Sequence, residues 1–408
     1  MTYIVEKNNT SLTGIIDLPT SKSISNRLLI IRALTQDGFP IHNISISKDT
    51  ELMLAAFEST ADDINIGHAG TTMRFLTAYH VAKNKERKIF GSERMHNRPI
   101  AKLVDALRQL NADVTYLEKE GFPPLHIKPT ELQGNKVEID GSVSSQYITA
   151  LLMVAPELPN GLNLIIKNRL VSQAYVKLTL SLMEYLGVKH TWNDNVITIE
   201  KQQYSPKEMT VEADWSGASY WYEMAALCDN VDITIKGLQS DSLQGDSVIA
   251  NIYTQFGVHS KFENNTVKLT KHNVSCAYFD FDFSDCPDLV QTVVPTCVIK
   301  KIPFKITGAE TLRIKETDRI AALQTELAKL GANIKETKPG TLIWSGNDEI
   351  NIPDNVAFDT YDDHRMALAF APLAIASKIK INEPNVVVKS YPNFWEHLKQ
   401  VGFTIDNL

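Results

Sequence analysis

The sequence predicts an α/β (α+β) fold in which one helix–strand unit recurs. Five amphipathic helices each end at a Gly or Asn that is followed by a small or apolar residue and then by strand-like segments. The residues that end these helices, roughly 70 positions apart, are Asn111, Gly187, Gly257, Gly331 and Gly402. A further helix at 50–57 fits the series but lacks its closing strands. Six units indicate two domains of three units each, and plain helix–strand alternation is the alternative.

Each element is expected from its local pattern. Apolar residues at helical spacing predict helices at 28–34, 75–81, 103–110, 147–154, 182–186, 252–256, 320–330, 367–376 and 398–401. Short β-rich runs predict strands at 14–18, 164–166, 196–199, 267–269 and 342–344. Asn- and Gly-containing turns, such as 193–195 and 264–265, separate several of these strands from their neighbours.

Composition limits the class of protein. A chain of 408 residues with 43% hydrophobic and 22% charged residues is a globular protein long enough for several domains. The net charge of −7 argues against nucleic acid as the partner, and without a run of 18 apolar residues we expect no membrane association. The sequence shows no signal peptide, and its four cysteines show no CxxC spacing, so we expect reduced thiols and a cytoplasmic protein.

The expected domain limits come from stretches that contain no unit, near residues 12–20 and 211–216. We expect a discontinuous C-terminal-side domain of residues 1–19 plus 213–408 and an inserted N-terminal-side domain of residues 20–212. If the first strand pairs with the second half, the chain crosses between the domains twice.

The most informative segment is Arg313-Ile-Lys-Glu-Thr-Asp-Arg319, which directly precedes the helix at 320–330. A cap at Thr317 or Asp318 would place Lys315 and Glu316 at the mouth of this helix. Helix N-termini carry unpaired N–H groups and partial positive charge, so they bind anions. Taken alone, the segment favours a solvated helix start with local ion pairs.

Cationic residues stand near several expected helix starts, that of this segment included. They are Lys22, Arg27, Arg98, Lys315, Arg319, Arg365 and Lys389. Each position has an ordinary alternative as a capped or solvated helix end. Together they favour a cleft that binds more than one phosphate or carboxylate group, with Asp288 and Glu316 as the acid–base candidates.

Several motifs in this order resemble the enolpyruvyl transferase family, and in particular its members that act on shikimate 3-phosphate. The similarity runs nearly end to end. The motifs are Ser21-Lys-Ser-Ile-Ser-Asn-Arg27, Ala69-Gly-Thr-Thr-Met-Arg74, Arg98-Pro-Ile100, Ser144-Ser-Gln146, Val171-Ser172, Gln244-Gly-Asp246, Pro287-Asp288, 313–319, Asp363-His-Arg-Met366 and Lys389. The resemblance implies two domains, each an inside-out α/β barrel of three βαβαββ units, with the active site in the interdomain cleft.

The resemblance also implies roles for individual residues. Shikimate 3-phosphate would be bound by Lys22, Ser23, Arg27, Ser144, Ser145, Gln146, Ser172, Tyr175, Asp288 and Lys315. Phosphoenolpyruvate would be bound by Lys22, Gly70, Arg98, Gln146, Arg319, His364, Arg365 and Lys389. Asp288 resembles the base, Glu316 resembles the acid, and Lys22 is the third catalytic candidate. No metal or organic cofactor is implied, and we expect a monomer whose partners are these two small molecules.

This chain departs from the family pattern at three positions and in its shortened first repeat. His68 and Phe75 replace an Asn and a Pro beside the expected phosphoenolpyruvate site, and Thr311 replaces an Asn that contacts shikimate. The two alternatives are a transferase acting on a UDP-sugar and a silent anion-binding protein on the same scaffold. Lys22-Ser23 and the absence of a cysteine before Cys228 argue against the first, and Asp288 with Glu316 argues against the second.

Overall fold

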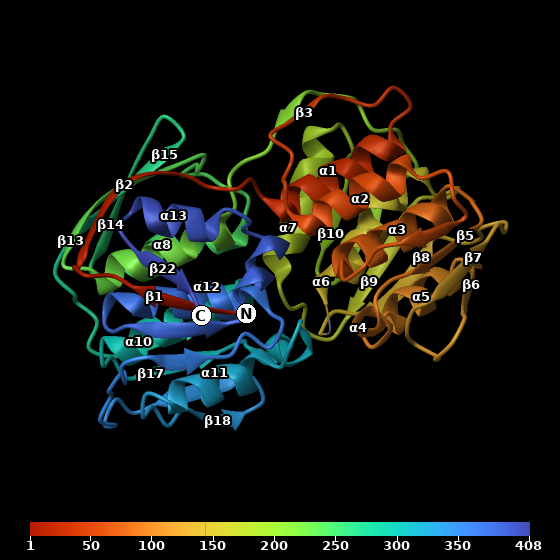
Figure 1. The fold of residues 1–408 in the computed structure, drawn as a ribbon. Coiled ribbons are helices and arrows are strands. Elements are labelled where there is room, and N and C mark those ends of the chain that lie inside the picture. The colour runs from red at the N-terminus through yellow and green to blue at the C-terminus, as the bar shows by residue number, and fades with distance from the viewer. Residues whose placement is uncertain (143) are drawn as a thin grey trace. The chain divides into compact units, whose positions relative to one another are not determined.

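The computed structural model describes residues 1–142 and 144–408, which divide into two compact units (Figure 1). Unit 1 comprises Met1–Thr20 and Glu212–Leu408, and unit 2 comprises Ser21–Val211. Each unit has its own hydrophobic core. The mixed α/β class expected from the sequence is confirmed.

A single topology recurs in both units. In the described residues the strands form six sheets, and five of these have four strands. In the sheet β16-β17-β19-β18, the strand β16 (Phe279–Asp282) pairs in parallel with β17 (Phe304–Thr307) through α10 (Val290–Ile299). Helix α11 (Arg319–Ala328) follows, and an antiparallel hairpin closes the sheet. The repeat is therefore βαβαββ.

Unit 1 contains three such sheets. The first is the sheet just described, in which β18 (Lys335–Lys338) and β19 (Thr341–Trp344) join β16 and β17. The second consists of β14 (Val258–Glu263), β15 (Thr266–Lys271), β13 (Asn230–Lys236) and β2 (Ser11–Asp17). The third consists of β20 (Val356–Phe358), β21 (Ile379–Asn382), β1 (Thr2–Glu6) and β22 (Thr404–Asn407). The other helices are α8 (Trp215–Leu227), α9 (Ile249–Thr254), α12 (His364–Phe370) and α13 (Phe394–Gln400), with short 3-10 helices η2 (Gly245–Val248), η3 (Pro287–Leu289), η4 (Glu310–Ile314), η5 (Ala371–Ile375) and η6 (Pro384–Lys389).

Unit 2 contains two complete repeats. Their strands are β4 (Asp63–Asn65), β5 (Arg87–Phe90), β7 (Leu125–Lys128) and β6 (Asp113–Tyr116), and β8 (Lys136–Asp140), β9 (Leu162–Lys167), β11 (Val196–Ile199) and β10 (Thr191–Asn193). The helices are α1 (Lys22–Leu34), α2 (Lys48–Glu58), α3 (Gly70–Ala82), α4 (Glu93–His96), α5 (Ala101–Arg108), α6 (Ser145–Val154) and α7 (Gln173–Tyr185), with η1 (Ala155–Glu157).

The remaining sheet is the shortened repeat. It has only β12 (Met209–Thr210) and β3 (Ile41–His42), paired in parallel, because α2 leads directly to β4 of the next sheet. Strand β12 is followed in the chain by α8 of unit 1, whereas β2 pairs with β13 of unit 1 and is followed by α1 of unit 2. Strand β1 likewise pairs with β21 and β22, so two sheets of unit 1 and one sheet of unit 2 contain a strand from a distant part of the chain.

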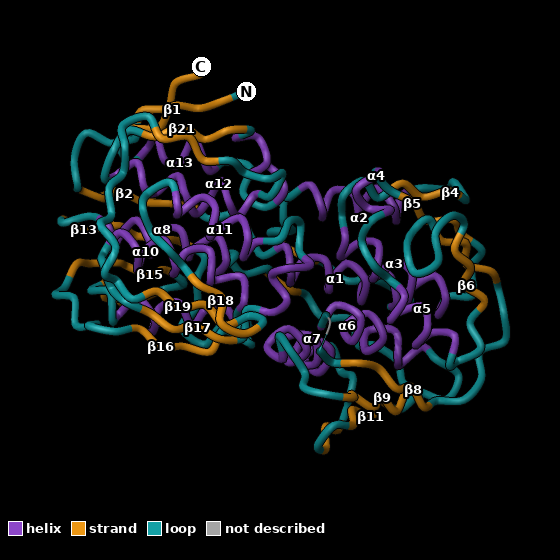
Figure 2. The backbone as a smooth tube through the Cα atoms, turned by 90° about the horizontal axis from the view of Figure 1, so that it is seen from below, coloured by secondary structure: helices purple, strands orange, loops and turns teal. Residues whose placement is uncertain are grey.

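The burial pattern explains where the helices lie. Helices α8 and α10 are buried along nearly their whole length, so they lie at the centre of unit 1 with the sheets outside them (Figure 2). Helix α11 buries only one face, which includes Ile320, Leu323 and Leu327 as the helical spacing predicted. No helix in the described part of the chain combines the length and apolar character needed to cross a membrane.

Connection geometry places the candidate residues. In a parallel βαβ unit the helix starts at the carboxyl end of the first strand, where ligands of α/β proteins commonly bind. Helix α10 follows β16, α11 follows β17 and α12 follows β20, so their N-termini share one end of unit 1. Lys315, Glu316, Asp288 and Arg365 all stand at these helix starts.

Candidate functional site

In unit 1, the predicted residues gather around Arg319. This side chain is 1% exposed and lies in the first turn of α11, which Asp318 caps by accepting a hydrogen bond from the Ala321 N–H. Its guanidinium donates to three carboxylates: Asp363 (Nε to Oδ2, 2.8 Å), Asp288 (Nη1 to Oδ1, 2.9 Å) and Glu316 (Nη2 to Oε2, 2.8 Å). Burial opposes the charge on Arg319, but these carboxylates outweigh burial and raise its pKa.

Asp288 lies in η3, just before α10, and contacts three cations. Its Oδ1 is 2.9 Å from Arg319 Nη1 and 3.4 Å from Lys315 Nζ, and its Oδ2 is 2.9 Å from Arg365 Nη2. Burial alone would raise the pKa of Asp288, but Arg365, Lys315 and Arg319 together hold the pKa well below its ordinary value. The carboxyl is therefore ionised and strongly compensated.

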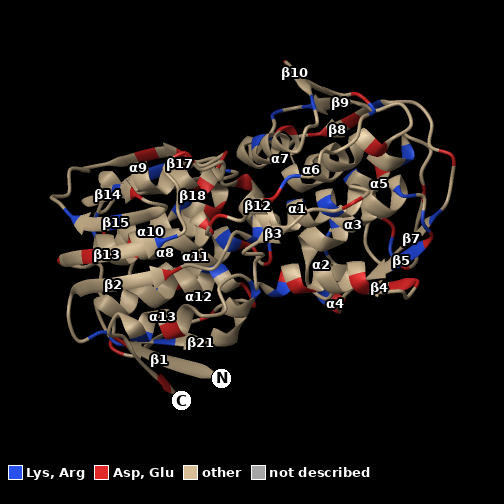
Figure 3. Ribbon diagram, turned by 90° about the horizontal axis from the view of Figure 1, so that it is seen from above, with Lys and Arg blue, Asp and Glu red and all other residues tan. Residues whose placement is uncertain are grey.

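Glu316 connects two of the predicted cations. Its Oε2 accepts from Arg319, and its Oε1 lies 3.2 Å from Nζ of Lys389 at the end of η6. Its side chain is 13% exposed, so it is accessible to a ligand. Acidic and basic segments adjoin beside α11 in Figure 3.

Helix α12 brings His364 and Arg365 to the same network. Asp363 caps this helix by accepting from the Arg365 N–H (3.0 Å), while its two oxygens hold Arg319. The preceding residues, Tyr361 and Asp362, both have a positive φ (53° and 54°). Nδ1 of His364 is 3.7 Å from Asp363 Oδ1. The seven residues predicted in this unit are therefore brought together.

In unit 2, Arg27 is buried (3% exposed) where α1 meets α7. Its guanidinium donates to Thr179 Oγ1 (2.8 Å), to the Ser23 carbonyl (2.7 Å) and to the Tyr175 carbonyl (3.5 Å). The rings of Phe75 and Tyr175 lie 5.7 and 5.8 Å away. Burial lowers the pKa of Arg27 to about 10, which still leaves it charged at neutral pH.

The start of α3 packs against two arginines. Gly70 begins this helix, and a Cβ built there would lie 2.4 Å from Arg98 Nη1 and 2.9 Å from Arg74 Nη1. Arg74 donates to Gln146 Oε1 (2.6 Å) in the first turn of α6, and the Gln146 amide lies 3.3 Å from Thr71 Oγ1. Gly70, Arg98 and Gln146, all predicted from sequence, are thus neighbours.

The other predicted residues of unit 2 also stand at helix starts. Ser144 caps α6 by accepting from the Gln146 N–H (3.3 Å), and Ser145 and Ser172 are buried beside the ends of α6 and α7. Lys22 begins α1 and lies 3.6 Å from Asp49 Oδ2. With α3, four helix N-termini supply N–H groups and partial positive charge to this part of unit 2.

The three departures from the family pattern have distinct surroundings. Thr311 is 7% exposed, and its Oγ1 has no hydrogen-bond partner among the described residues. Phe75 is fully buried under Arg27. His68 Nδ1 lies 2.6 Å from Ser92 Oγ.

Sequence reasoning missed several residues that hold the site. Asp363, Ser216 and Arg74 contact predicted residues. Asp246 in turn contacts Ser216. None of these four is assigned a role from the sequence. Arg74, Asp246 and Asp363 stood inside quoted motifs, so the signal was present in the sequence. Ser216 is one of many serines near helix starts, and its sequence context carries no such signal.

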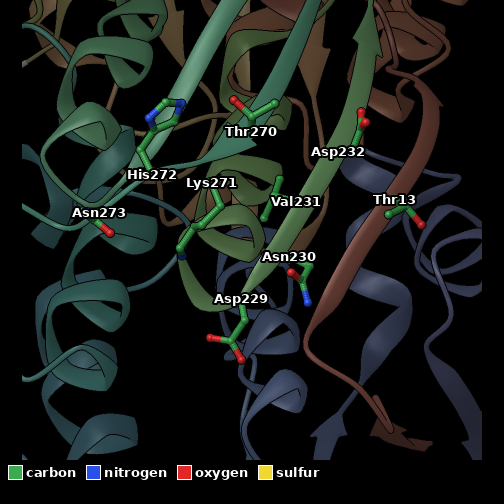
Figure 4. Close-up of a pocket in the computed structure, with 9 residues that line it drawn as sticks. All are labelled: Thr13, Asp229, Asn230, Val231, Asp232, Thr270, Lys271, His272 and Asn273. Atoms are coloured by element: carbon green, nitrogen blue, oxygen red, sulfur yellow. The ribbon is translucent and has the colours of Figure 1, made fainter.

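A hollow of about 450 Å³ elsewhere in unit 1 contains none of the predicted residues (Figure 4). Its lining includes Lys271, Asp229 and His272. Lys271 donates to the carbonyls of Ala225 (3.1 Å) and Ala226 (2.5 Å), so it satisfies the C-terminal end of α8. Burial lowers the pKa of Lys271 to about 8. These bonds account for the lysine structurally.

Solved structures share the fold of this chain. EPSP synthase from Acinetobacter baumannii matches with a TM-score of 0.79 at 18% identity and covers 100% of both chains. The enolpyruvyl transferase NikO from Streptomyces tendae matches with a TM-score of 0.73 at 14% identity, covering 99% of this chain and 98% of the other. The fold is therefore that of the enolpyruvyl transferases.

Sequence comparison narrows the class to a family. The family model described as EPSP synthase (3-phosphoshikimate 1-carboxyvinyltransferase) matches residues 6–61 and 55–398. Relatives named 3-phosphoshikimate 1-carboxyvinyltransferase include one from Bacteroides fragilis, 46% identical over 96% of this chain and 95% of the relative. Another, from Shewanella pealeana, is 36% identical over 96% of this chain and 97% of the relative. The chain belongs to the EPSP synthase family.

Proposed function

We propose that this protein transfers the enolpyruvyl group of phosphoenolpyruvate to the 5-hydroxyl of shikimate 3-phosphate. The products are phosphate and 5-enolpyruvylshikimate 3-phosphate, an intermediate on the route to chorismate and the aromatic amino acids. The observation that carries the proposal is that Asp288 and Glu316 share one network with Lys315, Arg319, Arg365 and Lys389 in a chain of this family. Both substrates are polyanions, and the reaction needs a proton acceptor at the 5-hydroxyl and a proton donor at the methylene carbon of phosphoenolpyruvate.

The proposed binding roles follow the two clusters. For shikimate 3-phosphate we assign Lys22, Ser23, Arg27, Ser144, Ser145, Gln146, Ser172, Tyr175, Asp288 and Lys315. For phosphoenolpyruvate we assign Lys22, Gly70, Arg98, Gln146, Arg319, His364, Arg365 and Lys389. Support comes from the grouping of these residues at helix N-termini within each unit, where N–H groups and cations favour phosphate and carboxylate.

The proposed reaction has two halves. Glu316 gives a proton to the methylene carbon of phosphoenolpyruvate, and positive charge builds up on the neighbouring carbon. The 5-hydroxyl oxygen bonds to that carbon, and its proton passes to Asp288. In the second half, the new methyl group returns a proton to Glu316, and the bond to the phosphate oxygen breaks. The leaving phosphate takes the proton from Asp288, so both carboxyl groups return to their starting states.

Asp288 can serve as a base only if its pKa is higher than it is in the present structure. Three cations hold the pKa of this carboxyl low. Each substrate brings several negative charges toward Arg365, Lys315 and Arg319, which offsets these cations. The pKa of Asp288 consequently rises when the substrates bind, and the base becomes effective only in the complex. Arginines and lysines then stabilise the departing phosphate.

We further propose that units 1 and 2 are the two domains of the fold, that the protein is a monomer and that it acts in the cytoplasm. Four unpaired cysteines, three of them buried, are compatible with a reducing compartment. Chromatography coupled to light scattering measures the mass of the species in solution, and a mass near 91 kDa in place of the 45.6 kDa chain would contradict the monomer (twice 45.6 is about 91).

Phosphate release tests the activity. The purified protein is mixed with phosphoenolpyruvate and shikimate 3-phosphate, with a UDP-sugar acceptor as a parallel arm. We expect release only with shikimate 3-phosphate, together with the new enol ether by mass spectrometry. Release only with the UDP-sugar would reassign the acceptor, and release with neither would overturn the proposal. Asp288→Asn is the matched variant, since it keeps the shape of the side chain and removes its charge.

A further inference from the structure

Asp246 is connected through one serine to Arg365, which is proposed to bind phosphoenolpyruvate. It stands in η2 and is 4% exposed. Its Oδ2 accepts a hydrogen bond from Ser216 Oγ in the first turn of α8. Ser216 Oγ is also 3.2 Å from Arg365 Nη2, which is 2.9 Å from Asp288 Oδ2. Four elements thus contribute to one chain of contacts, Asp246–Ser216–Arg365–Asp288.

The available donors determine the direction of each hydrogen bond in this chain of contacts. A serine hydroxyl has one hydrogen, whereas an ionised carboxylate only accepts hydrogen bonds and a guanidinium only donates them. When Asp246 is ionised, the hydrogen of Ser216 must point toward Asp246. The lone pairs of Ser216 then face Arg365, so the hydroxyl accepts from the guanidinium and holds Nη2 against Asp288.

A second feature sets Asp246 apart from a simple buried anchor. Its Oδ1 is buried and makes no hydrogen bond with the described residues. An unsatisfied buried carboxylate oxygen is costly and is retained where it serves a purpose. The neighbouring charges are those of Asp288, Arg365 and Asp214, with the Cys286 thiol also close enough to interact. Two carboxyl groups, Asp246 and Asp288, therefore compete for the charge of one guanidinium.

We propose that Asp246, acting through Ser216, is a positioning residue that orients Arg365 toward phosphoenolpyruvate and keeps Arg365 paired with the base Asp288. This inference rests on the proposed function, because Arg365 and Asp288 have their roles there. Asp246 itself does not contact the substrates. Its ionised form is the active one, since a protonated Asp246 has a donor of its own and no longer fixes the hydrogen of Ser216.

The ionisation of Asp246 gives a signature that a purely structural role would lack. Burial and the charge of Asp288 raise the pKa of Asp246 to about 6, with Arg365 and the bond from Ser216 opposing the shift. The group is protonated as the pH falls through this value. We expect the kcat/KM for phosphoenolpyruvate of the natural protein to fall along with it, because kcat/KM reports ionisations of the free enzyme.

The test compares Asp246→Asn, Ser216→Ala and Ser216→Thr with an Asp241→Asn control, which changes an exposed carboxyl in the same loop. Kinetics are measured from pH 5 to 8. We expect Asp246→Asn and Ser216→Ala to raise the KM for phosphoenolpyruvate by about tenfold, the loss of one hydrogen bond to a charged group. We expect both to lose the acid limb near pH 6. Ser216→Thr keeps the hydroxyl and restores the natural values, and Asp241→Asn behaves like the natural protein.

The outcomes separate this inference from the proposed function. If the natural protein releases no phosphate, the proposed function is overturned and this inference falls with it. If the natural protein is active and the Asn and Ala variants keep its KM and its pH profile, only the role of Asp246 is overturned. A uniform loss of activity with an unchanged pH profile, together with a lower thermal unfolding midpoint, also overturns it, since that result describes a structural residue.

Discussion

Gly70→Ala gives a direct test of the cluster in unit 2, because the added Cβ would overlap neighbouring guanidinium groups. The new Cβ would lie 2.4 Å from Arg98 Nη1 and 2.8 Å from Arg98 Cζ, whereas ordinary contacts begin at 3.4 Å. The guanidinium must therefore move by about 1 Å (3.4 minus 2.4). Arg74 Nη1 would also be close, at 2.9 Å. Because these clashes are with the far ends of flexible side chains, the fold accommodates the change, and Arg98 moves the most.

The magnitude follows from the geometry of a charged hydrogen bond. A displacement of about 1 Å takes a donor from about 2.8 Å to about 3.8 Å from its acceptor, beyond hydrogen-bond range. Hydrogen bonds to charged groups contribute about 1.5–3 kcal/mol. We therefore expect the KM for phosphoenolpyruvate to rise roughly tenfold to a hundredfold, while the KM for shikimate 3-phosphate changes little.

The assay is steady-state phosphate release with each substrate varied in turn, together with the thermal unfolding midpoint. Gly217→Ala is the matched control, since this glycine also lies in the first turn of a helix and its added Cβ would meet atoms no closer than 3.7 Å. The control should keep both KM values. An unchanged KM for phosphoenolpyruvate in Gly70→Ala would refute the assignment of Arg98. A large drop in the unfolding midpoint would refute the view that movement of the two arginine side chains relieves the clash.

Three further predictions concern different parts of the molecule. Glu316→Gln keeps the shape of the side chain but removes the acid, so kcat should fall by about 10²- to 10⁴-fold while calorimetry still detects binding of both substrates. Tyr361→Phe removes the 2.6 Å bond to buried Glu326, which loosens the turn before α12 and should raise the KM for phosphoenolpyruvate several-fold by steady-state kinetics. His80 is buried, and burial with Arg87 and Lys85 lowers its pKa to about 4. As the pH falls, this histidine therefore binds a proton in the unfolded chain before it does so in the folded protein. The free energy of unfolding consequently decreases as the pH drops from about 6.5 toward 4. Urea unfolding should show a loss of about 2 kcal/mol from pH 7 to pH 5 that is missing in His80→Phe.

Each of these predictions can fail in its own way. Near-normal turnover in Glu316→Gln would assign the proton donation to another group. For Tyr361→Phe, unchanged kinetics would mean that the other two partners of Glu326, Lys329 and the Asp359 N–H, hold the turn on their own. Equal pH dependence of unfolding in the natural protein and His80→Phe would show that this histidine titrates normally.

Local signals in the sequence predicted much of the fold. The spacing of Ile320, Leu323 and Leu327 gave the buried face of α11, and the caps at Asp318 and Ser144 are those expected from residues that favour helix starts. The shortened first repeat was also visible, because no hairpin pattern follows α2. These features depend on residues close together in the chain, which is why they could be predicted.

Long-range pairings could not be predicted in the same way. No local pattern indicates that Leu12 in β2 lies opposite Val231 in β13, because that register depends on the packing of the folded core. The same holds for the site: cations near helix starts pointed to Arg365 and Asp288, whereas Ser216 joins them only through the meeting of α8 with α12. A hydroxyl gives no signal in sequence until its two partners are known.

The pairing of β1 and β2 has a consequence for the newly made chain. These strands are made before unit 2, but β13 begins at residue 230 and β21 at residue 379. Unit 2 is uninterrupted in the chain and has all its strands once residue 211 has emerged. Domains of nascent proteins generally fold in order of synthesis, so unit 2 folds while the amino-terminal strands still lack their sheets. The edge of β2 stays unpaired and prone to misassociation until β13 has been made, and the edge of β1 until β21 has been made.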